Sequence, residues 1–208
     1  MTRSIFRRNI AWVAEHARAD PDLFKRKALN AQASILWIGC SDNLTPALET
    51  AAFEDEGCLV HRNLGNQASL HDSNFLATLA YALQLRSLER IVICGHYGCR
   101  CLYDVLQEKM QVGTENWLSP ITGLFRLNRR QLDAIVSEDA QIQSLCEINV
   151  RMQVRKLSEH PLVEARLGVG SLKIEGVMWS ARDGLLRDPG IAVGRTAKSS
   201  KADRPQRR

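Results

Sequence analysis

Two short apolar runs, each followed at once by residue types that bind metals, constrain the fold of this chain most. Residues 34–38 (Ser-Ile-Leu-Trp-Ile) precede Cys40 and Asp42, and residues 90–94 (Arg-Ile-Val-Ile-Cys) precede His96. Continuous apolar runs of this length are typical of strands that are buried on both faces of a parallel sheet. Because ligands collect beyond the carboxyl ends of such strands, we expect these three side chains at one edge of the sheet.

The rest of the chain alternates between helical and strand patterns. Helical periodicity covers residues 4–28 with a break at Asp20 and Pro21, then 74–85, 100–110, most of 117–160 with its longest run at 133–157, and 161–166. Further strands are expected at 58–61 and 171–179, and a turn at 181–184. This alternation predicts an α/β fold with a central, mostly parallel β-sheet flanked by helices.

The length of 208 residues fits one core, and 45% hydrophobic with 25% charged residues is the balance of an ordinary globular protein. We divide the chain into an N-terminal helical arm (1–30), a core domain (31–194) and a basic tail (195–208). Six of the fourteen tail residues are Lys or Arg, so we expect the tail to be disordered.

Several classes of protein are excluded by what the sequence lacks. No apolar run reaches the roughly 18 residues of a membrane span, and residues 1–8 lack the apolar core of a secretory signal, so we expect a cytoplasmic protein without a membrane partner. Most of the excess positive charge lies in the tail, without interleaved aromatic residues, so we expect no nucleic-acid partner. The six cysteines are expected as reduced thiols: Cys40, Cys58, Cys94, Cys99, Cys101 and Cys146.

The spacing of His96 and Cys99 is compatible with a metal site. The two residues lie three apart at a strand-to-helix turn, and Cys40 can reach the same ion if its strand neighbours that of His96. A catalytic zinc site keeps three protein ligands and an open fourth position. By spacing alone, packing cysteines and a hydrogen-bonded histidine remain an alternative. Cys101 is expected to be a buried thiol and not a ligand, because residues two apart on a helix face different ways.

At these residues the chain resembles the β-class carbonic anhydrases, from about Asn9 to Asp188. The segment 37–42 resembles the family's Cys-x-Asp-x-Arg motif, 62–66 its Arg-Asn-x-x-Asn segment, and 93–99 its Gly-His-x-x-Cys motif. Shorter similarities occur at 116–118, 147–150 and 183–188.

The resemblance implies zinc held by Cys40, His96 and Cys99. It implies reversible hydration of carbon dioxide to bicarbonate, since zinc lowers the pKa of a bound water to about 7. It also implies a homodimer that shares sheets and N-terminal arms, and often a homotetramer.

The chain departs from the family at the Asp-Arg pair. Asp42 matches the family's catalytic aspartate, which accepts a hydrogen bond from the reacting species, but Leu44 replaces the arginine that holds it. An aspartate without that partner is expected to be drawn to the metal as a fourth ligand, unless Arg62 or Arg100 replaces the missing cation. We therefore expect reduced activity.

Further departures lie around the pocket. Arg100 and Cys101 replace the family's Gly-Gly, and Leu64 with Gly65 is a milder change. The residues expected to border the substrate, a small molecule, are Arg62, Leu44, Gly98 and Arg100. Trp37, Arg62 and Trp179 match a regulatory bicarbonate site of some members, but Trp179 lacks the hydroxyl that the site needs.

Two other functions stay open. Leu44 and Arg100 could reshape the pocket for a larger substrate, which would give a zinc hydrolase, decarboxylase or dehydratase. Alternatively, ligation by Asp42 could close the zinc site in a non-catalytic relative.

Overall fold

The computed structural model describes residues 4–29, 33–51 and 57–194, and the predicted tail lies outside them. The strands are β1 (Ala33–Cys40), β2 (Gly57–Asn63), β3 (Arg90–His96), β4 (Lys173–Trp179) and β5 (Leu186–Gly194). The helices are α1 (Ile5–Ala19), α2 (Leu23–Leu29), α3 (Ala47–Ala51), α4 (Ser73–Gln84), α5 (Arg100–Leu106), α6 (Glu115–Asp133), α7 (Glu138–Ser158) and α8 (Pro161–Gly168).

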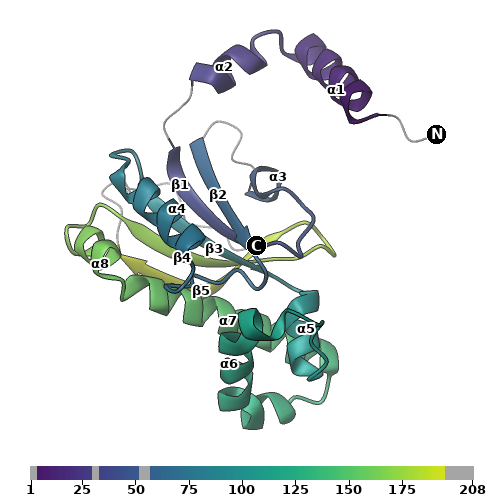
Figure 1. Ribbon diagram of the computed structural model, residues 1–208, viewed down its shortest axis with the longest axis vertical. Coiled ribbons are helices and arrows are strands. Elements are labelled where there is room, and N and C mark those ends of the chain that lie inside the picture. The colour runs from purple at the N-terminus through teal and green to yellow at the C-terminus, as the bar shows by residue number, and fades with distance from the viewer. Residues whose placement is uncertain (1–3, 30–32, 52–56, 195–208) are drawn as a thin grey trace, which may run out of the picture.

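The five strands form one sheet in the order β2-β1-β3-β4-β5 (Figure 1). The first four run parallel and β5 is antiparallel to β4, so the predicted mostly parallel sheet is confirmed. β1 and β3 are neighbours, with Gly39 opposite Cys94 in the register. The carboxyl ends of these two strands therefore deliver Cys40 and His96 to the same edge of the sheet.

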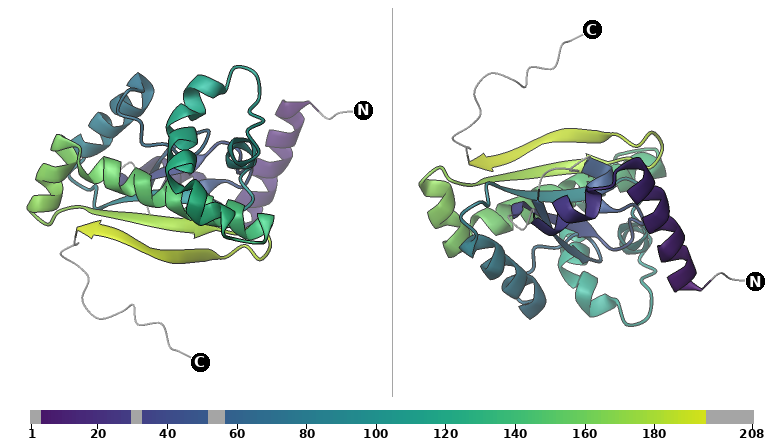
Figure 2. Two further views of the ribbon diagram at one scale, coloured as in Figure 1. Left: turned by 90° about the horizontal axis from the view of Figure 1, so that it is seen from below. Right: turned by 90° about the horizontal axis from the view of Figure 1, so that it is seen from above.

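The sheet buries side chains on both faces, as the apolar runs predicted. Leu36 and Ile38 of β1 belong to a large core with Phe75 of α4 and Val150 of α7. Trp37 points to the opposite face, into a smaller cluster of buried residues. α7 packs against β3 and β4, and α4 packs against β1 and β2 (Figure 2). This two-sided burial fixes the register of β1 and β3 and hence the position of the residues that follow them.

Strand β5 and helix α3 were not predicted. The sequence predicts a turn at 181–184 and no strand after it, because β5 contains Pro189 and Gly190 and is mostly exposed. Proline is tolerated in a sheet at an edge strand, where β5 lies. The position of β5 at the edge, against β4, was not visible in a local pattern of apolar residues.

The helical stretch predicted at 117–160 is two helices, α6 and α7. The run expected from residue 133 begins at 138 instead, because Ser137 is the N-cap of α7 and its hydroxyl oxygen accepts a hydrogen bond from the amide of Ala140. Such a cap satisfies one of the unpaired amides of the first helical turn.

The N-terminal arm is helical, as predicted, with the break at Asp20 separating α1 from α2. The two helices lie to one side of the sheet (Figure 1). No residue of α1 is buried, and Ile5, Phe6 and Ile10 are at least two-thirds exposed. Of the helices that the structure describes, none combines the length and apolar character that crossing a membrane requires.

Candidate metal centre

A cluster of thiol, imidazole and carboxylate side chains lies where β1 and β3 end. Cys40 is the last residue of β1, and Asp42 lies in the loop after it. His96 is the last residue of β3, and Cys99 is the N-cap of α5. Cys101, in the first turn of α5, lies in the same cluster. The topology thus gathers residues from two separate chain segments.

The ligand atoms form two groups that share Cys99. One group is Cys40, Cys99 and Cys101, and the other is Asp42, His96 and Cys99; within each group the ligand atoms lie within 4.8 Å of one another. The Sγ atom of Cys40 lies 3.8 Å from that of Cys99 and 4.0 Å from that of Cys101. The Sγ atoms of Cys99 and Cys101 are 3.3 Å apart.

The imidazole of His96 fits a metal at this position. Its Nε2 atom is buried and has no hydrogen-bond partner among the described residues. The nearest carboxylate oxygen, Oδ2 of Asp42, is 3.8 Å away, which is too long for a hydrogen bond. A buried ring nitrogen without a partner is costly in a protein that binds nothing there. Thiolate sulfur and imidazole nitrogen are together the donors that zinc prefers.

Asp42 is held by main chain and not by a cationic side chain. Its Oδ2 atom accepts a hydrogen bond from the backbone amide of Arg100 at 2.5 Å. The side chain of Leu44 is 91% exposed and cannot serve as a partner. The guanidinium of Arg100 points elsewhere, donating from Nε to Oδ1 of Asp104 at 2.9 Å. Within residues 4–29, 33–51 and 57–194, Asp42 forms no ion pair with a Lys or Arg.

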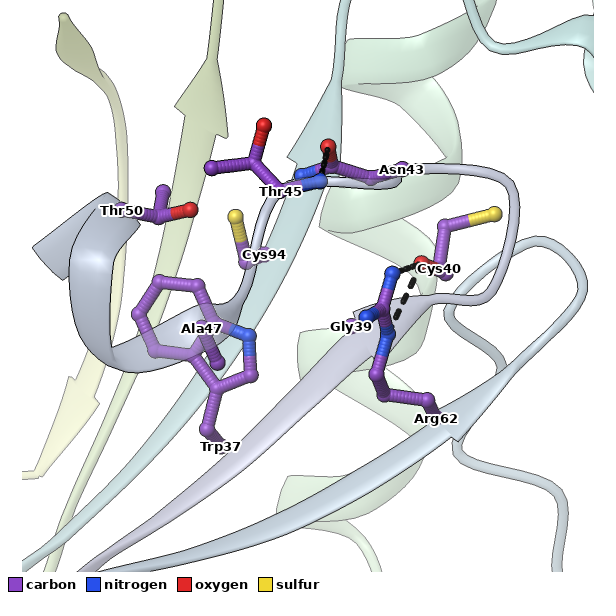
Figure 3. Close-up of a pocket in the computed structure, with 9 residues that line it drawn as sticks. All are labelled: Trp37, Gly39, Cys40, Asn43, Thr45, Ala47, Thr50, Arg62 and Cys94. Carbon is purple, nitrogen blue, oxygen red and sulfur yellow. Dashed lines mark hydrogen bonds between the residues drawn. The ribbon is translucent and has the colours of Figure 1, made fainter. Parts of the chain in front are cut away.

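Arg62 does not reach Asp42 either. It donates from Nε and Nη2 to the carbonyl oxygen of Cys40, at 3.3 and 2.8 Å. Figure 3 shows the guanidinium on this carbonyl, with the Cys40 sulfur pointing away from Trp37 and Cys94. Arg62 therefore stabilises the end of β1. It lines a pocket beside the metal cluster, and Asn43 and Thr45 line the same pocket.

The four residues predicted to border the substrate are spread over different surroundings. Gly98 and Arg100 line a second pocket, of about 230 Å³, with Tyr103, Glu138 and Asp139. Arg62 lines the pocket of Figure 3 instead. Leu44 lines neither of these pockets. The structure thus brings together the predicted metal-site residues more closely than the predicted substrate residues.

A hydrogen bond from the loop after β2 orients the thiol of Cys40. The amide of Gly65 donates to Sγ of Cys40 at 3.2 Å. Gly65 has a φ of +79°, and its carbonyl accepts from Nδ2 of Asn149 at 2.9 Å. The same loop is closed by Asn63, whose side chain bonds both the amide and the carbonyl of Gln67. Such outer contacts fix ligand orientation and tune ligand basicity.

The three clustered thiols polarise one another. Hydrogen bonds from Cys101 and Cys99 hold the pKa of Cys40 well below its usual range. The pKa of Cys99 is raised by its hydrogen bonds with Cys101 and Cys40, and the pKa of Cys101 is raised by its hydrogen bond with Cys40. Negative charge in the cluster therefore concentrates on Cys40. The nucleophilic and metal-binding form of cysteine is this thiolate.

The prediction that Cys101 is a buried thiol is confirmed. The reason for expecting it to point away from Cys99, that residues two apart on one helix face different ways, does not apply here. In the structure Cys99 is the N-cap, with φ −58° and ψ 115°, so it lies outside the helix and its side chain turns toward that of Cys101. The thiol of Cys101 is buried, as predicted, but it contacts the two predicted ligand thiols.

The fold and cluster together define an α/β protein with cysteine, histidine and aspartate side chains that could hold a metal ion at the carboxyl edge of a parallel sheet. A family model described as carbonic anhydrase matches residues 35–186. A carbonic anhydrase of Emericella nidulans is 33% identical over 189 residues, covering 90% of this chain and 82% of the relative. The chain therefore belongs to the β-carbonic anhydrase family.

Solved structures agree with this assignment. A tetrameric β-carbonic anhydrase of Sordaria macrospora has a TM-score of 0.84 and 27% identity, covering 91% of this chain and 96% of that one. The β-carbonic anhydrase of Coccomyxa, in complex with acetazolamide, has a TM-score of 0.81 and 26% identity, covering 92% and 87%.

Proposed function

We propose that this protein is a zinc-dependent carbonic anhydrase that hydrates carbon dioxide to bicarbonate reversibly and at a reduced rate. The observation that carries the proposal is that two groups of ligand atoms meet at Cys99, at the carboxyl edge of β1 and β3. Cys40 belongs to one group, and His96 and Asp42 belong to the other. Membership of the family and the unpaired Nε2 of His96 support zinc as the ion.

The proposed metal ligands and Asp42 have different roles. Cys40, His96 and Cys99 would hold zinc, which when bound lowers the pKa of a water to about 7. Asp42 uses Oδ2 to accept from the amide of Arg100, and Oδ1 has no partner among the described residues. Oδ1 can therefore accept a hydrogen bond from the reacting water and orient it, which is a catalytic role.

The reduced rate follows from how weakly Asp42 is restrained. One amide hydrogen bond fixes only one oxygen of its carboxylate, whereas an arginine fork would fix both oxygens. Because Leu44 is exposed and Arg100 is paired with Asp104, neither supplies that fork. An aspartate that turns toward the ion would occupy the position that water needs.

Assembly into a homodimer or homotetramer belongs to the same proposal. The exposed apolar residues of α1, among them Ile5, Phe6 and Ile10, would be covered by a partner subunit. The relative from Sordaria macrospora is tetrameric. Size-exclusion chromatography with light scattering tests the assembly.

The division of the chain at residues 30 and 194 and the cytoplasmic location of the protein stay predictions.

A second candidate function is hydrolysis, decarboxylation or dehydration of a larger substrate by the same zinc site. The observation that favours it is the pocket of about 230 Å³ beside Gly98 and Arg100, which exceeds what carbon dioxide requires. A non-catalytic protein with a closed zinc shell is the third possibility.

One experiment separates these functions. The purified protein is analysed for zinc per chain, and carbon dioxide hydration is followed with a pH indicator between about pH 7 and 9, where zinc-activated water ionises. We expect about one zinc per chain, as in single-ion catalytic sites, and slow hydration. Zinc without any hydration would favour the second or third function, and a chain without zinc would overturn the proposal.

A further inference from the structure

The thiol of Cys101 is placed where a metal ligand would be. It lies 3.3 Å from Sγ of Cys99 and 4.0 Å from Sγ of Cys40. The three sulfur atoms therefore enclose a common point at the carboxyl edge of the sheet. The other buried thiols, Cys94 and Cys146, belong to neither group of possible ligands among the described residues.

The sulfur separations match a tetrahedral zinc site. Two thiolates at the usual zinc-sulfur distance of about 2.3 Å are about 3.8 Å apart when the angle at the ion is tetrahedral. The pairs that involve Cys40 have separations of 3.8 and 4.0 Å. Only the pair Cys99 and Cys101, at 3.3 Å, must open by a few tenths of an ångström, which a side-chain rotation provides.

A fourth donor is also available. Nε2 of His96 is buried, lacks a hydrogen-bond partner among the described residues, and belongs with Cys99 to the second group of ligand atoms. Asp42 competes less well, because its Oδ2 already accepts from the amide of Arg100. Three thiolates and one imidazole form one of the common closed zinc sites.

We propose that Cys101 is a zinc ligand, so that Cys40, Cys99, Cys101 and His96 fill the coordination shell and Asp42 stays outside it. This inference rests on the zinc binding of the proposed function and deepens it. Hydration then requires that Cys101 leaves the ion, so the third thiolate is itself a cause of the slow rate. The alternative is that Cys101 only fills core volume. That role would not require its sulfur to contact both predicted ligand thiols, as it does.

The number of sulfur ligands is measured by X-ray absorption at the zinc edge on the full-length zinc-loaded protein. We expect about three sulfur and one nitrogen neighbours in the unchanged chain and about two sulfurs in Cys101→Ala, by the ligand sets of structural and catalytic sites. Cys94→Ala removes an equally buried thiol outside the cluster and should retain about three.

A second readout uses cobalt in place of zinc. The near-ultraviolet charge-transfer band between sulfur and cobalt should lose about a third of its intensity in Cys101→Ala and none in Cys94→Ala, because the band scales with the thiolates bound. Cys101→Ser, which keeps the size of the side chain, should give the same loss.

Hydration by Cys101→Ala should rise about tenfold, the effect of about 1.4 kcal/mol on the barrier.

The outcomes separate the two proposals. Two sulfurs in the unchanged chain, or a spectrum that Cys101→Ala and Cys101→Ser leave unaltered, would overturn the role of Cys101 while the zinc enzyme stands. An unchanged chain that binds neither zinc nor cobalt would overturn both.

Discussion

The backbone amide of Arg100 donates a hydrogen bond to Oδ2 of Asp42, although the two residues are 58 positions apart in the sequence. Arg100 therefore contacts the proposed catalytic aspartate through its main chain, which any residue carries. Its side chain is 68% exposed and pairs with Asp104. The contact with Asp42 thus does not depend on the side chain of Arg100, whereas the exposed side chain of Leu44 can supply no ion pair to Asp42.

Asp42→Asn tests the catalytic role of Asp42. The amide can still accept from Arg100 but loses the charge that orients the reacting water, so we expect kcat/KM for hydration to fall at least about tenfold, or about 1.4 kcal/mol. Zinc content should not change. Asp133→Asn, at an exposed position of α6, is the control. Loss of zinc together with activity would instead make Asp42 a ligand.

Leu44→Arg and Cys101→Ala together test whether two separate defects slow the enzyme. Restoring arginine alone should give a gain of only a few fold, since the third thiolate still closes the site, and the double variant should exceed the product of the single gains. Because Leu44 is 91% exposed, the free energy of unfolding should change by less than about 0.5 kcal/mol.

Leu44→Gln separates the charge of the new side chain from its length. It should leave kcat/KM for hydration at the level of its own background, which is that of the unchanged protein in one case and that of Cys101→Ala in the other. If the gain in kcat/KM of the double variant Leu44→Arg and Cys101→Ala equals the product of the two single gains, this result would count against a closed coordination shell.

Gly65→Ala tests the hydrogen bond from the amide of Gly65 to Sγ of Cys40. A methyl group there would lie 2.4 Å from Cδ1 of Ile121, and the φ of +79° is unfavourable for alanine. We expect a loss of more than about 2 kcal/mol in the free energy of unfolding. Zinc affinity should fall about tenfold or more, because the amide that bonds Sγ of Cys40 is displaced.

Gly170→Ala is the matched control for this substitution. Gly170 also has a positive φ, of +67°, but a methyl group there meets nothing within 4 Å. It should cost only the backbone strain of about 1–2 kcal/mol and leave zinc affinity unchanged. Equal losses in the two variants, by denaturant unfolding and metal titration, would show that the contact with Ile121 is unimportant.

Removal of the metal should destabilise the protein. At a free zinc concentration of about 100 times Kd, binding contributes about 2.7 kcal/mol, and a chain of this size then unfolds about 5–10 °C higher. We therefore expect a strong chelator to lower the unfolding midpoint in calorimetry by about this amount. The control is His71→Ala, outside the cluster, which should show the same shift. A midpoint unaffected by the chelator would mean that the cluster is not occupied by metal.

Tyr97 should titrate unusually late. Partial burial and the hydrogen bond from its hydroxyl to Glu147, at 2.7 Å, raise the pKa of Tyr97 from 10.0 to about 12. The folded protein thus holds this proton more tightly than the unfolded chain. The resulting stability is complete below about pH 10 and is lost as the pH rises through about 12.

The absorbance of tyrosinate measures this ionisation directly. One of the three tyrosines should ionise near pH 12, and Tyr97→Phe should abolish that step. Tyr81→Phe, at a side chain that is 60% exposed, should retain it. A late step that survives in Tyr97→Phe would assign the raised pKa to another residue.

The local sequence pattern was sufficient for the central strands. β1 and β3 are buried on both faces, so their apolar runs are continuous. Cys40 and His96 are the last residues of these two strands. The edge strand β5 was not predictable in this way, because it is mostly exposed and contains Pro189, and only its pairing with β4 makes it a strand.

For the candidate site, the sequence by itself determined which donor types are available and that Leu44 leaves Asp42 without an arginine. Tertiary structure decided what those residues contact. The N-cap conformation of Cys99 turns its thiol toward Cys101, and the start of α5 brings the amide of Arg100 to Asp42. Spacing along a chain fixes directions only within one regular element, and these contacts join a strand end, a cap and a helix, whose relative positions follow from the packing of the whole sheet.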